Sequence, residues 1–177
     1  MRAIMLATRR LELRPVRMAD AAAFFDHARI PEVAKNAGFL PNSISETKAY
    51  LRRSVSEWRQ RRPERMTFSI ILKGQRRWIG SIELRWLNPG IGEIGFFIHH
   101  NQWGKGFATE AASAVVRWAF AKGKAHRLQG SCWTKNAASI RVMKKLGFRK
   151  EGILRGYAKV VKQLQDDILF GKTIADR

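Results

Sequence analysis

Hydrophobic and polar positions alternate along the chain with two periods, one typical of strands and one typical of helices. Runs rich in β-branched and aromatic residues predict strands near 11–15, 66–72, 78–87, 91–98, 127–133, 149–156 and 164–172. Apolar residues spaced three and four apart predict helices near 19–28, 45–60, 108–122 and 137–146. Asn88-Pro89-Gly90 predicts a hairpin turn, and Gly123 and Gly147 lie where two helices should end.

The order of these elements predicts the fold class. A strand, a helix and a second strand follow one another over 91–133, which implies a parallel crossover inside an otherwise antiparallel sheet. The sequence shows no internal repeat, low-complexity tract or long linker. At 177 residues the chain has the length of one domain with a proper core. We therefore expect residues 1–177 to form a single α/β domain with a mixed, mostly antiparallel sheet.

The junction between the strand at 91–98 and the helix at 108–122 suggests a binding site. Its sequence over 99–110 is His-His-Asn-Gln-Trp-Gly-Lys-Gly-Phe-Ala-Thr-Glu. Gly104, Gly106 and Ala108 allow the backbone to approach a bulky anion, which the unpaired first N–H groups of a helix can bind. A P-loop needs four residues between its first glycine and Gly-Lys-Ser/Thr, and this spacing does not occur here. The dinucleotide fingerprint needs a third small residue after Ala108 and an acidic residue about 20 positions further on, and these are missing too. The turn therefore predicts a pyrophosphate site of another kind.

This turn resembles motif A of the GCN5-related N-acetyltransferases, the GNAT superfamily, in which Q/R-x-x-G-x-G/A cradles the pyrophosphate of acetyl-coenzyme A. Trp103, Gly106 and Ala108 occupy the three signature positions. Trp103 departs from the usual Gln or Arg. The run Trp-Gly-Lys-Gly-Phe-Ala-Thr-Glu-Ala is nevertheless similar to the Rim-type branch, the ribosomal-protein N-terminal acetyltransferases.

The resemblance covers almost the whole chain. Residues 8–15, followed by Asp-Ala at 20–21, are similar to the opening strand and first helix of the Rim-type branch. Asn-x-x-Ser at 136–139, Lys-Leu-Gly-Phe at 145–148 and Glu-Gly at 151–152 look like its downstream signature. Asp166 or Asp167 matches the acidic residue that opens its last strand.

The resemblance implies the GNAT fold, in which two central strands splay apart and the pantetheine arm of the coenzyme lies in the gap like an added strand. Gly95 lies in the middle of the predicted strand at 91–98. It marks either a bulge or a point of close approach to the backbone, or it is an accommodation to side-chain packing. Backbone N–H groups beside Phe96 and Phe97 would stabilise a developing oxyanion. The residues implied to bind acetyl-coenzyme A are Phe96, Phe97, Ile98, Trp103, Gly104, Lys105, Gly106, Phe107, Ala108, Thr109 and Asn136.

The implied reaction is direct attack of a primary amine on the acetyl thioester, which requires a neutral amine, a stabilised oxyanion and an acid for the departing thiolate. The resemblance gives the acid position to Ser139, and Tyr157 is the second candidate. Ser139 also fits a purely structural interpretation, as a first-turn residue after an N-cap at Asn136. Glu93 is the candidate base, and Glu83 in the neighbouring strand is the alternative. Either glutamate could instead be a solvated strand charge, since a carboxyl with a pKa of about 4.3 removes protons poorly at pH 7.

His99 and His100 raise the question of a metal site. Adjacent strand residues point to opposite faces, and no third ligand is spaced to join them. We therefore expect no metal and interpret both as loop histidines, one of them lining the coenzyme entrance.

Composition adds a strong positive charge. The chain has 34 Lys and Arg against 14 Asp and Glu, a formal charge of +20. This charge should attract polyanions such as coenzyme A, RNA or ribosomal surfaces, or serve solubility alone. Lys105, and Arg141, Lys144 and Lys145 on a later helix, could recruit a 3′-phosphate of the coenzyme or be merely solvated.

An arginine-rich segment surrounds an apolar helix stripe. Leu51, Val55 and Trp58 have helical spacing, which favours a core role for Trp58 over a substrate pocket. The basic residues predict either contact with an acidic or RNA-associated partner or a solvated face. They are Arg52, Arg53, Arg59, Arg61, Arg62 and Arg65.

Cysteine content and hydropathy bear on location. Cys132 is the single cysteine, which excludes an intrachain disulfide framework. No apolar run approaches the roughly 20 residues that span a bilayer, and the N-terminal stretch carries Arg9, Arg10, Glu12 and Arg14 instead of an apolar core. We expect a cytoplasmic protein, monomeric or homodimeric, with no membrane partner.

The sequence therefore predicts an acetyl-coenzyme A dependent N-acetyltransferase that acts on the N-terminal α-amine of a protein, in particular a ribosomal protein. An α-amine, with a pKa of about 7.7–8.0, is partly neutral near pH 7, whereas lysine at about 10.4 demands a stronger base. Two alternatives are a small-molecule amine acetyltransferase and a non-catalytic, basic ribosome- or RNA-binding module. No RNA-binding aromatic motif supports the module.

Overall fold

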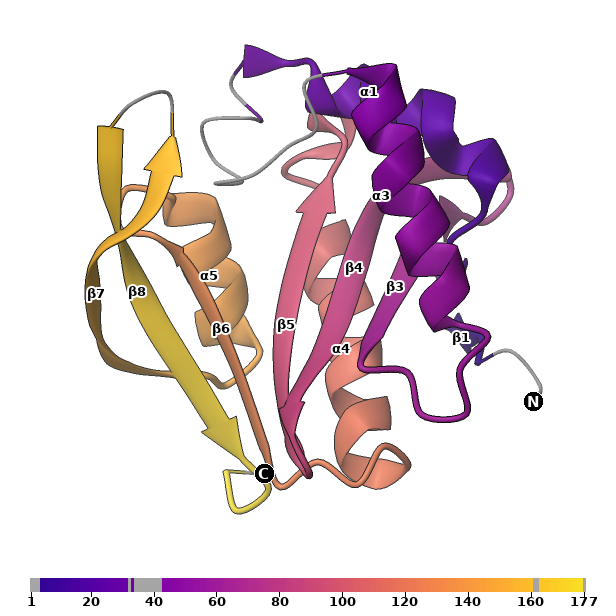
Figure 1. The fold of residues 1–177 in the computed structure, drawn as a ribbon. Coiled ribbons are helices and arrows are strands. Elements are labelled where there is room, and N and C mark those ends of the chain that lie inside the picture. Colours follow the sequence, from indigo (N-terminus) through magenta and orange to yellow (C-terminus); the bar gives the residue numbers. More distant parts are fainter. Residues whose placement is uncertain (1–3, 32, 34–42, 161–162, 177) are drawn as a thin grey trace.

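A computed structural model describes residues 4–31, 33, 43–160 and 163–176, whose strands form one sheet in the order β1-β2-β3-β4-β5-β6-β8-β7 (Figure 1). The strands are β1 (Leu6–Ala7), β2 (Leu11–Pro15), β3 (Arg65–Leu72), β4 (Arg77–Asn88), β5 (Ile91–Ile98), β6 (Arg127–Trp133), β7 (Arg149–Val160) and β8 (Gln163–Thr173). The helices are α1 (Ala21–Ala28), α3 (Ile44–Glu57), α4 (Phe107–Ala121) and α5 (Ala137–Lys145), with 3-10 turns η1 (Met18–Asp20) and η2 (His100–Gln102).

One parallel pair of strands, β5 and β6, joins two antiparallel parts of the sheet. Its register runs from Ile91 with Arg127 to Glu93 with Gln129, and these strands make no further pairs within the described residues. Beyond Glu93 the two strands diverge, while β5 continues to pair with β4 (Figure 1). The structure thus confirms the mixed α/β fold with splayed central strands.

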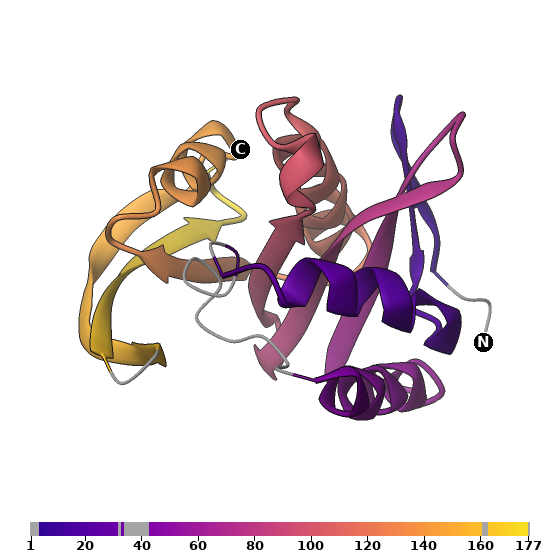
Figure 2. The same ribbon diagram turned by 90° about the horizontal axis from the view of Figure 1, so that it is seen from above.

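Helices cover both faces of this sheet (Figure 2): α4 and α5 lie on one side, and α1 and α3 on the other. Ala111, Val115 and Ala119 of α4 are completely buried, as the apolar stripe of this helix predicted. Burial of a side chain the size of valine stabilises the folded state by about 1.5–3 kcal/mol, so this stripe anchors α4 and the loop before it.

A second apolar cluster lies between α1, α3 and the sheet. Phe24 and Leu51 are buried there, and Val55 and Trp58 pack around them. The indole Nε1 of Trp58 donates a hydrogen bond of 2.8 Å to the backbone carbonyl of Thr67. Trp58 is therefore a core residue, as its helical spacing indicated.

Most element boundaries lie within a few residues of the sequence prediction. The hairpin at Asn88-Pro89-Gly90 is confirmed, with Gly90 at a φ of +78°. The short strand β1 was not predicted, and β7 continues four residues past the predicted end at 156 because it keeps pairing with β8 after a register shift. Pairing with a neighbouring strand leaves no mark on local periodicity. None of the described helices is long and apolar enough to cross a membrane.

Candidate active site

A cleft of about 730 Å³ opens where β5 and β6 diverge. Its wall brings together the side chains predicted to carry the chemistry: Ser139, Tyr157, Glu83 and Glu93. Other parts of the wall come from α1, α3, β4, β6 and β8. The divergence of two strands thus creates a cavity that several distant segments share.

Gly95 lies in the segment of β5 that has lost its pairing with β6, and it lines the cleft. Its register with β4 is regular, so the bulge interpretation is wrong. A Cβ atom at this position would meet no heavy atom within 4 Å, so crowding by the protein does not explain the glycine. Open backbone facing a cavity is the arrangement that a closely approaching ligand requires.

The predicted pyrophosphate loop connects η2 to α4. Gly104 and Gly106 have φ angles of +75° and +77°, a region that side-chain-bearing residues rarely adopt. Gly106 is the N-cap of α4, where the first helical N–H groups have no partner within the helix. Trp103 donates a 2.6 Å hydrogen bond from Nε1 to the carbonyl of Ile98, which fastens the loop to the end of β5. Nζ of Lys105 donates a 3.2 Å hydrogen bond to the backbone carbonyl of Asn101 in η2.

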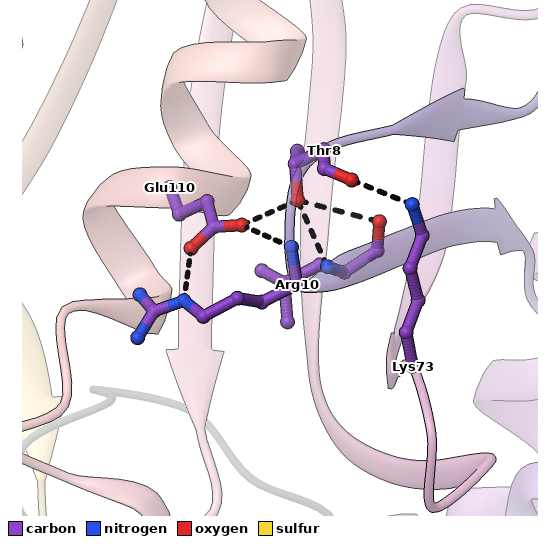
Figure 3. Close-up of polar contacts among 5 residues, drawn as sticks. Thr8, Arg10, Lys73 and Glu110 are labelled. Atoms are coloured by element: carbon purple, nitrogen blue, oxygen red, sulfur yellow. Dashed lines mark hydrogen bonds and ion pairs between the residues drawn. The ribbon is translucent and has the colours of Figure 1, made fainter.

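A polar cluster that the sequence analysis did not identify holds the first turn of α4 (Figure 3). Glu110 accepts hydrogen bonds from the hydroxyl of Thr8 at 2.5 Å, from the backbone N–H of Arg10 at 2.9 Å and from Nε of Arg10 at 2.6 Å. Lys73 donates to the carbonyl of Thr8 at 2.6 Å. Burial alone would raise the pKa of Glu110, but these hydrogen bonds outweigh it and hold that pKa below its ordinary value.

The structure confirms the cap interpretation of the motif at Asn136 and Ser139, and the acid role of Ser139 stays a prediction. The Asn136 side chain accepts a 3.0 Å hydrogen bond from the backbone N–H of Ser139, so Asn136 is the N-cap of α5. The cap engages only the backbone N–H of Ser139, and Ser139 lines the cleft. Tyr157, on β7, lines the same cleft and is 56% exposed.

Glu93 and Glu83 are both held by basic or hydroxyl groups. Glu93 forms a 2.7 Å ion pair with Arg85. Glu83 accepts a 3.2 Å hydrogen bond from the hydroxyl of Tyr50 and lies 3.4 Å from Nε of Arg65. Burial and the nearby Glu83 raise the pKa of Tyr50 to about 12. Each carboxylate therefore already has an ionic or hydrogen-bonding partner.

Asp167 lines the cleft, although the sequence analysis did not name it as a candidate for the chemistry. It is 8% exposed and accepts a 2.9 Å hydrogen bond from the hydroxyl of Ser131. Burial and the nearby Asp166 raise its pKa despite this bond. The family resemblance matched either Asp166 or Asp167, and the structure separates them. Asp166 accepts from the backbone N–H of Gly156 at 2.8 Å, whereas Asp167 faces the cleft.

His27 of α1 lies beside His99 and His100, so the expectation that no third ligand would join them is wrong. The chain bends directly after β5, and the rings of His99 and His100 stack with 4.5 Å between their centroids. Burial and the two neighbouring histidines lower the pKa of His27 to about 4. Local spacing could not reveal this contact, because α1 and the end of β5 meet only in the folded sheet.

The basic candidates separate into two groups. Arg53 and Arg65 line the cleft, whereas the other members of the arginine-rich segment do not. Arg141, Lys144 and Lys145 are exposed on α5. The cleft wall thus receives only a small part of the positive charge of the chain.

Comparison with known proteins agrees with this geometry. A family model described as "Acetyltransferase (GNAT) domain" matches residues 10–149. The chain is 31% identical over 168 residues to the uncharacterized N-acetyltransferase p20 of Bacillus licheniformis, with 93% of each chain covered. Its fold is similar to that of a GNAT-family acetyltransferase from Bacillus anthracis, with a TM-score of 0.85 and 23% identity over 96% of this chain and 98% of the other. It is also similar to RimL, a ribosomal L7/L12 alpha-N-protein acetyltransferase, in complex with coenzyme A. That comparison gives a TM-score of 0.86 and 16% identity over 98% of this chain and 100% of the other. The chain therefore belongs to the GNAT family and is an N-acetyltransferase.

Proposed function

We propose that the chain transfers the acetyl group of acetyl-coenzyme A to the N-terminal α-amine of a protein, with a ribosomal protein as the leading acceptor. The observation that carries this proposal is the cleft between the diverging strands, whose wall combines Gly95, Ser139, Glu93 and Asp167. RimL, which has the same fold, is named for α-amine acetylation of ribosomal L7/L12. A ribosomal acceptor would place the enzyme in the cytoplasm. Membership in the family favours an enzyme over a non-catalytic RNA-binding module.

The backbone fits the coenzyme at two places. The left-handed Gly104 and Gly106 leave room for a pyrophosphate at the N-terminus of α4, where N–H groups and the helix dipole favour an anion. The unpaired edge of β5 around Gly95 can hydrogen-bond the amides of a pantetheine arm. The residues proposed to bind acetyl-coenzyme A are Phe96, Phe97, Ile98, Trp103, Gly104, Lys105, Gly106, Phe107, Ala108, Thr109 and Asn136.

In the proposed reaction the amine nitrogen bonds to the thioester carbonyl carbon, the C–S bond breaks, and the thiolate leaves with a proton. Backbone N–H groups beside Phe96 and Phe97 stabilise the oxyanion. Ser139 donates the proton to the thiolate, since the N-cap of α5 engages its backbone and leaves its hydroxyl for the cleft. Tyr157 is the second candidate for this role.

The amine must also lose a proton. Glu93 is the candidate from the sequence, but its carboxylate is engaged in a 2.7 Å ion pair with Arg85. Asp167 faces the same cleft, has no cationic partner among the described residues, and has a raised pKa. A raised pKa makes a carboxylate a better proton acceptor near neutral pH. The geometry therefore supports Asp167 ahead of Glu93.

The cleft charge bears on the acceptor. Its wall contains five carboxyl residues and three arginines, although the chain as a whole carries a charge of +20. The carboxyl residues are Glu57, Glu64, Glu83, Glu93 and Asp167, and the arginines are Arg53, Arg65 and Arg85. An amine approaches as a cation, so this wall attracts it. The carboxyl-rich wall also supports a small-molecule amine as the second candidate acceptor.

A transfer assay separates these acceptors. Peptides with different N-termini, matched peptides with blocked α-amines and free lysines, and a panel of small diamines are incubated with labelled acetyl-coenzyme A. We expect label on free α-amines, located by mass spectrometry. Label on lysine side chains or on diamines alone would refute the α-amine proposal and leave the acetyltransferase assignment intact.

A further inference from the structure

A cluster of three histidines lies outside the cleft. It consists of His27 near the end of α1 and of His99 and His100, which follow β5. His27 is 1% exposed and His99 is 8% exposed. None of the three lines the cleft between β5 and β6.

Several ring nitrogens of this cluster are buried without a hydrogen-bond partner in the described part of the chain. They are Nδ1 and Nε2 of His27 and Nδ1 of His100. Buried polar atoms are normally paired, and a neutral imidazole has one N–H to donate and one lone pair to share. His27 also stacks on Phe97, with 4.8 Å between ring centroids and 11° between ring planes, so neighbouring side chains hold its ring. Within the described residues these buried nitrogens are therefore available to bind a ligand.

We propose that His27, His99 and His100 form a binding site for Zn²⁺ or a similar transition-metal ion. One ligand nitrogen from each residue lies within 4.8 Å of the other two. Zn–N bonds are about 2.0–2.1 Å long, so an ion at the centre requires each ring to shift inward by less than about 1 Å. Asp26, with its Oδ2 3.7 Å from Nε2 of His99, is placed either to supply a fourth ligand or to orient that ring.

The donor atoms of the cluster and the scarcity of carboxylates around it bear on the kind of ion. Nη2 of Arg29 lies 2.8 Å from Oδ1 of Asp26. Arg29 and Arg77 also line, together with His99 and His100, a second hollow of about 550 Å³ that leads to the cluster. Such surroundings disfavour Mg²⁺ and Ca²⁺, which bind through several oxygen ligands of negative charge. Imidazole nitrogens instead favour Zn²⁺, Cu²⁺, Ni²⁺ and Co²⁺.

A bound ion would join two elements that are far apart in the sequence. It would fasten the end of α1 to the segment that precedes the pyrophosphate loop at 103–108. Binding only to the folded state raises its stability in proportion to the logarithm of the free metal concentration. The site therefore has a structural role, separate from the transfer chemistry.

The test uses untagged full-length protein, stripped with EDTA and then titrated with Co²⁺ and Zn²⁺. We expect one Co²⁺ per chain with visible d–d absorption from nitrogen ligands, displacement by Zn²⁺, and a higher Tm in the presence of Zn²⁺. His27→Phe keeps an aromatic ring on Phe97 and removes one ligand, and His100→Asn removes another at a half-buried position. Each should weaken binding by at least ~10-fold. His126→Asn, at the one remaining histidine, is the matched control and should bind as the unsubstituted chain does.

Two results would overturn the site. One is the absence of stoichiometric Co²⁺ and Zn²⁺ binding by the unsubstituted chain. The other is unchanged affinity in His27→Phe and His100→Asn variants whose circular dichroism shows a normal fold. Because the readout is absorption and melting, it does not depend on acetyl transfer, and its failure is distinct from a failure of the proposed function.

Discussion

Arg10 and Glu110 lie 100 positions apart in the sequence and form a 2.6 Å ion pair (Figure 3). The guanidinium of Arg10 also lies 4.4 Å over the ring of Phe107. Its Nη2 is 3.6 Å from the position that a Cβ atom on Gly106 would occupy. Glu110 is in the first turn of α4, where an unpaired carboxylate would repel a phosphate. Arg10 offsets that charge and fixes the N-terminal end of the helix.

Glu110→Ala should destabilise the fold by about 1–3 kcal/mol, because Arg10 and Thr8 lose hydrogen bonds to a partly buried carboxylate. The lowered pKa of Glu110 means that its carboxylate stabilises the fold above the ordinary glutamate pKa of about 4.3. This contribution disappears as the pH falls through the lowered pKa. Urea denaturation at neutral and acidic pH measures both effects, with Arg9→Ala at an exposed neighbour as control. Equal stability of the two variants at neutral pH would contradict the prediction.

Gly106→Val should abolish binding of acetyl-coenzyme A while the fold survives. The left-handed backbone disfavours a β-branched residue, and the added side chain would occupy the space proposed for the pyrophosphate. Gly74→Val is a matched control, since Gly74 has a φ of +78° with no heavy atom near its Cβ position and lies in the turn between β3 and β4. Calorimetry should show lost affinity in the first variant alone. Normal affinity in folded Gly106→Val would remove the loop from the coenzyme site.

Ser139→Ala should lower kcat by about 10²-fold, since general acid catalysis contributes roughly 10²- to 10⁴-fold. Stability should change little, because the hydrogen bond to the Asn136 cap comes from the backbone N–H of Ser139 and survives the substitution. Coenzyme affinity, Tm and kcat are measured on one preparation. A near-normal kcat would exclude Ser139 as the acid and leave Tyr157 or water.

Asp167→Asn and Glu93→Gln separate the two candidate bases. If Asp167 accepts the proton, Asp167→Asn should lower kcat by at least ~10²-fold. It should also remove the acidic limb of the pH profile of kcat. In the unsubstituted chain the raised pKa of Asp167 places this limb at a higher pH than an ordinary aspartate would. A raised pKa also means that the buried charge costs stability at neutral pH, so the asparagine variant should melt at the same or a higher temperature. If only Glu93→Gln shows the kinetic loss, the base is Glu93.

Cys132 offers a chemical probe of the cleft. It is the single cysteine, lines the cleft, and has a thiol pKa that burial and Asp167 raise to about 11. The thiol is therefore mostly protonated at pH 7.5 and should react slowly with iodoacetamide. Saturating coenzyme A should slow this labelling further, by at least ~10-fold if the pantetheine arm lies along β6. Mass spectrometry of the alkylated fraction over time gives the rates, and equal rates with and without coenzyme A would place the arm elsewhere.

Features that depend on neighbours in the sequence were predictable without the structure. The hairpin at 88–90, the Asn136 cap and the glycine turn before α4 follow from the backbone preferences of a few consecutive residues. The apolar stripe of α4 follows from helical periodicity. The ordered motifs also indicated the correct family, since each short motif keeps its spacing along the chain.

Contacts between distant segments required the tertiary structure. Sheet register decides that Arg85 meets Glu93 and that Asp167, not Asp166, faces the cleft. The approach of α1 to the end of β5 brings His27 to His99, which adjacent positions in a strand could not suggest. The physical reason is that side-chain charge, burial and partners are set by packing across the sheet. Local sequence determines only the conformation of each segment before it packs.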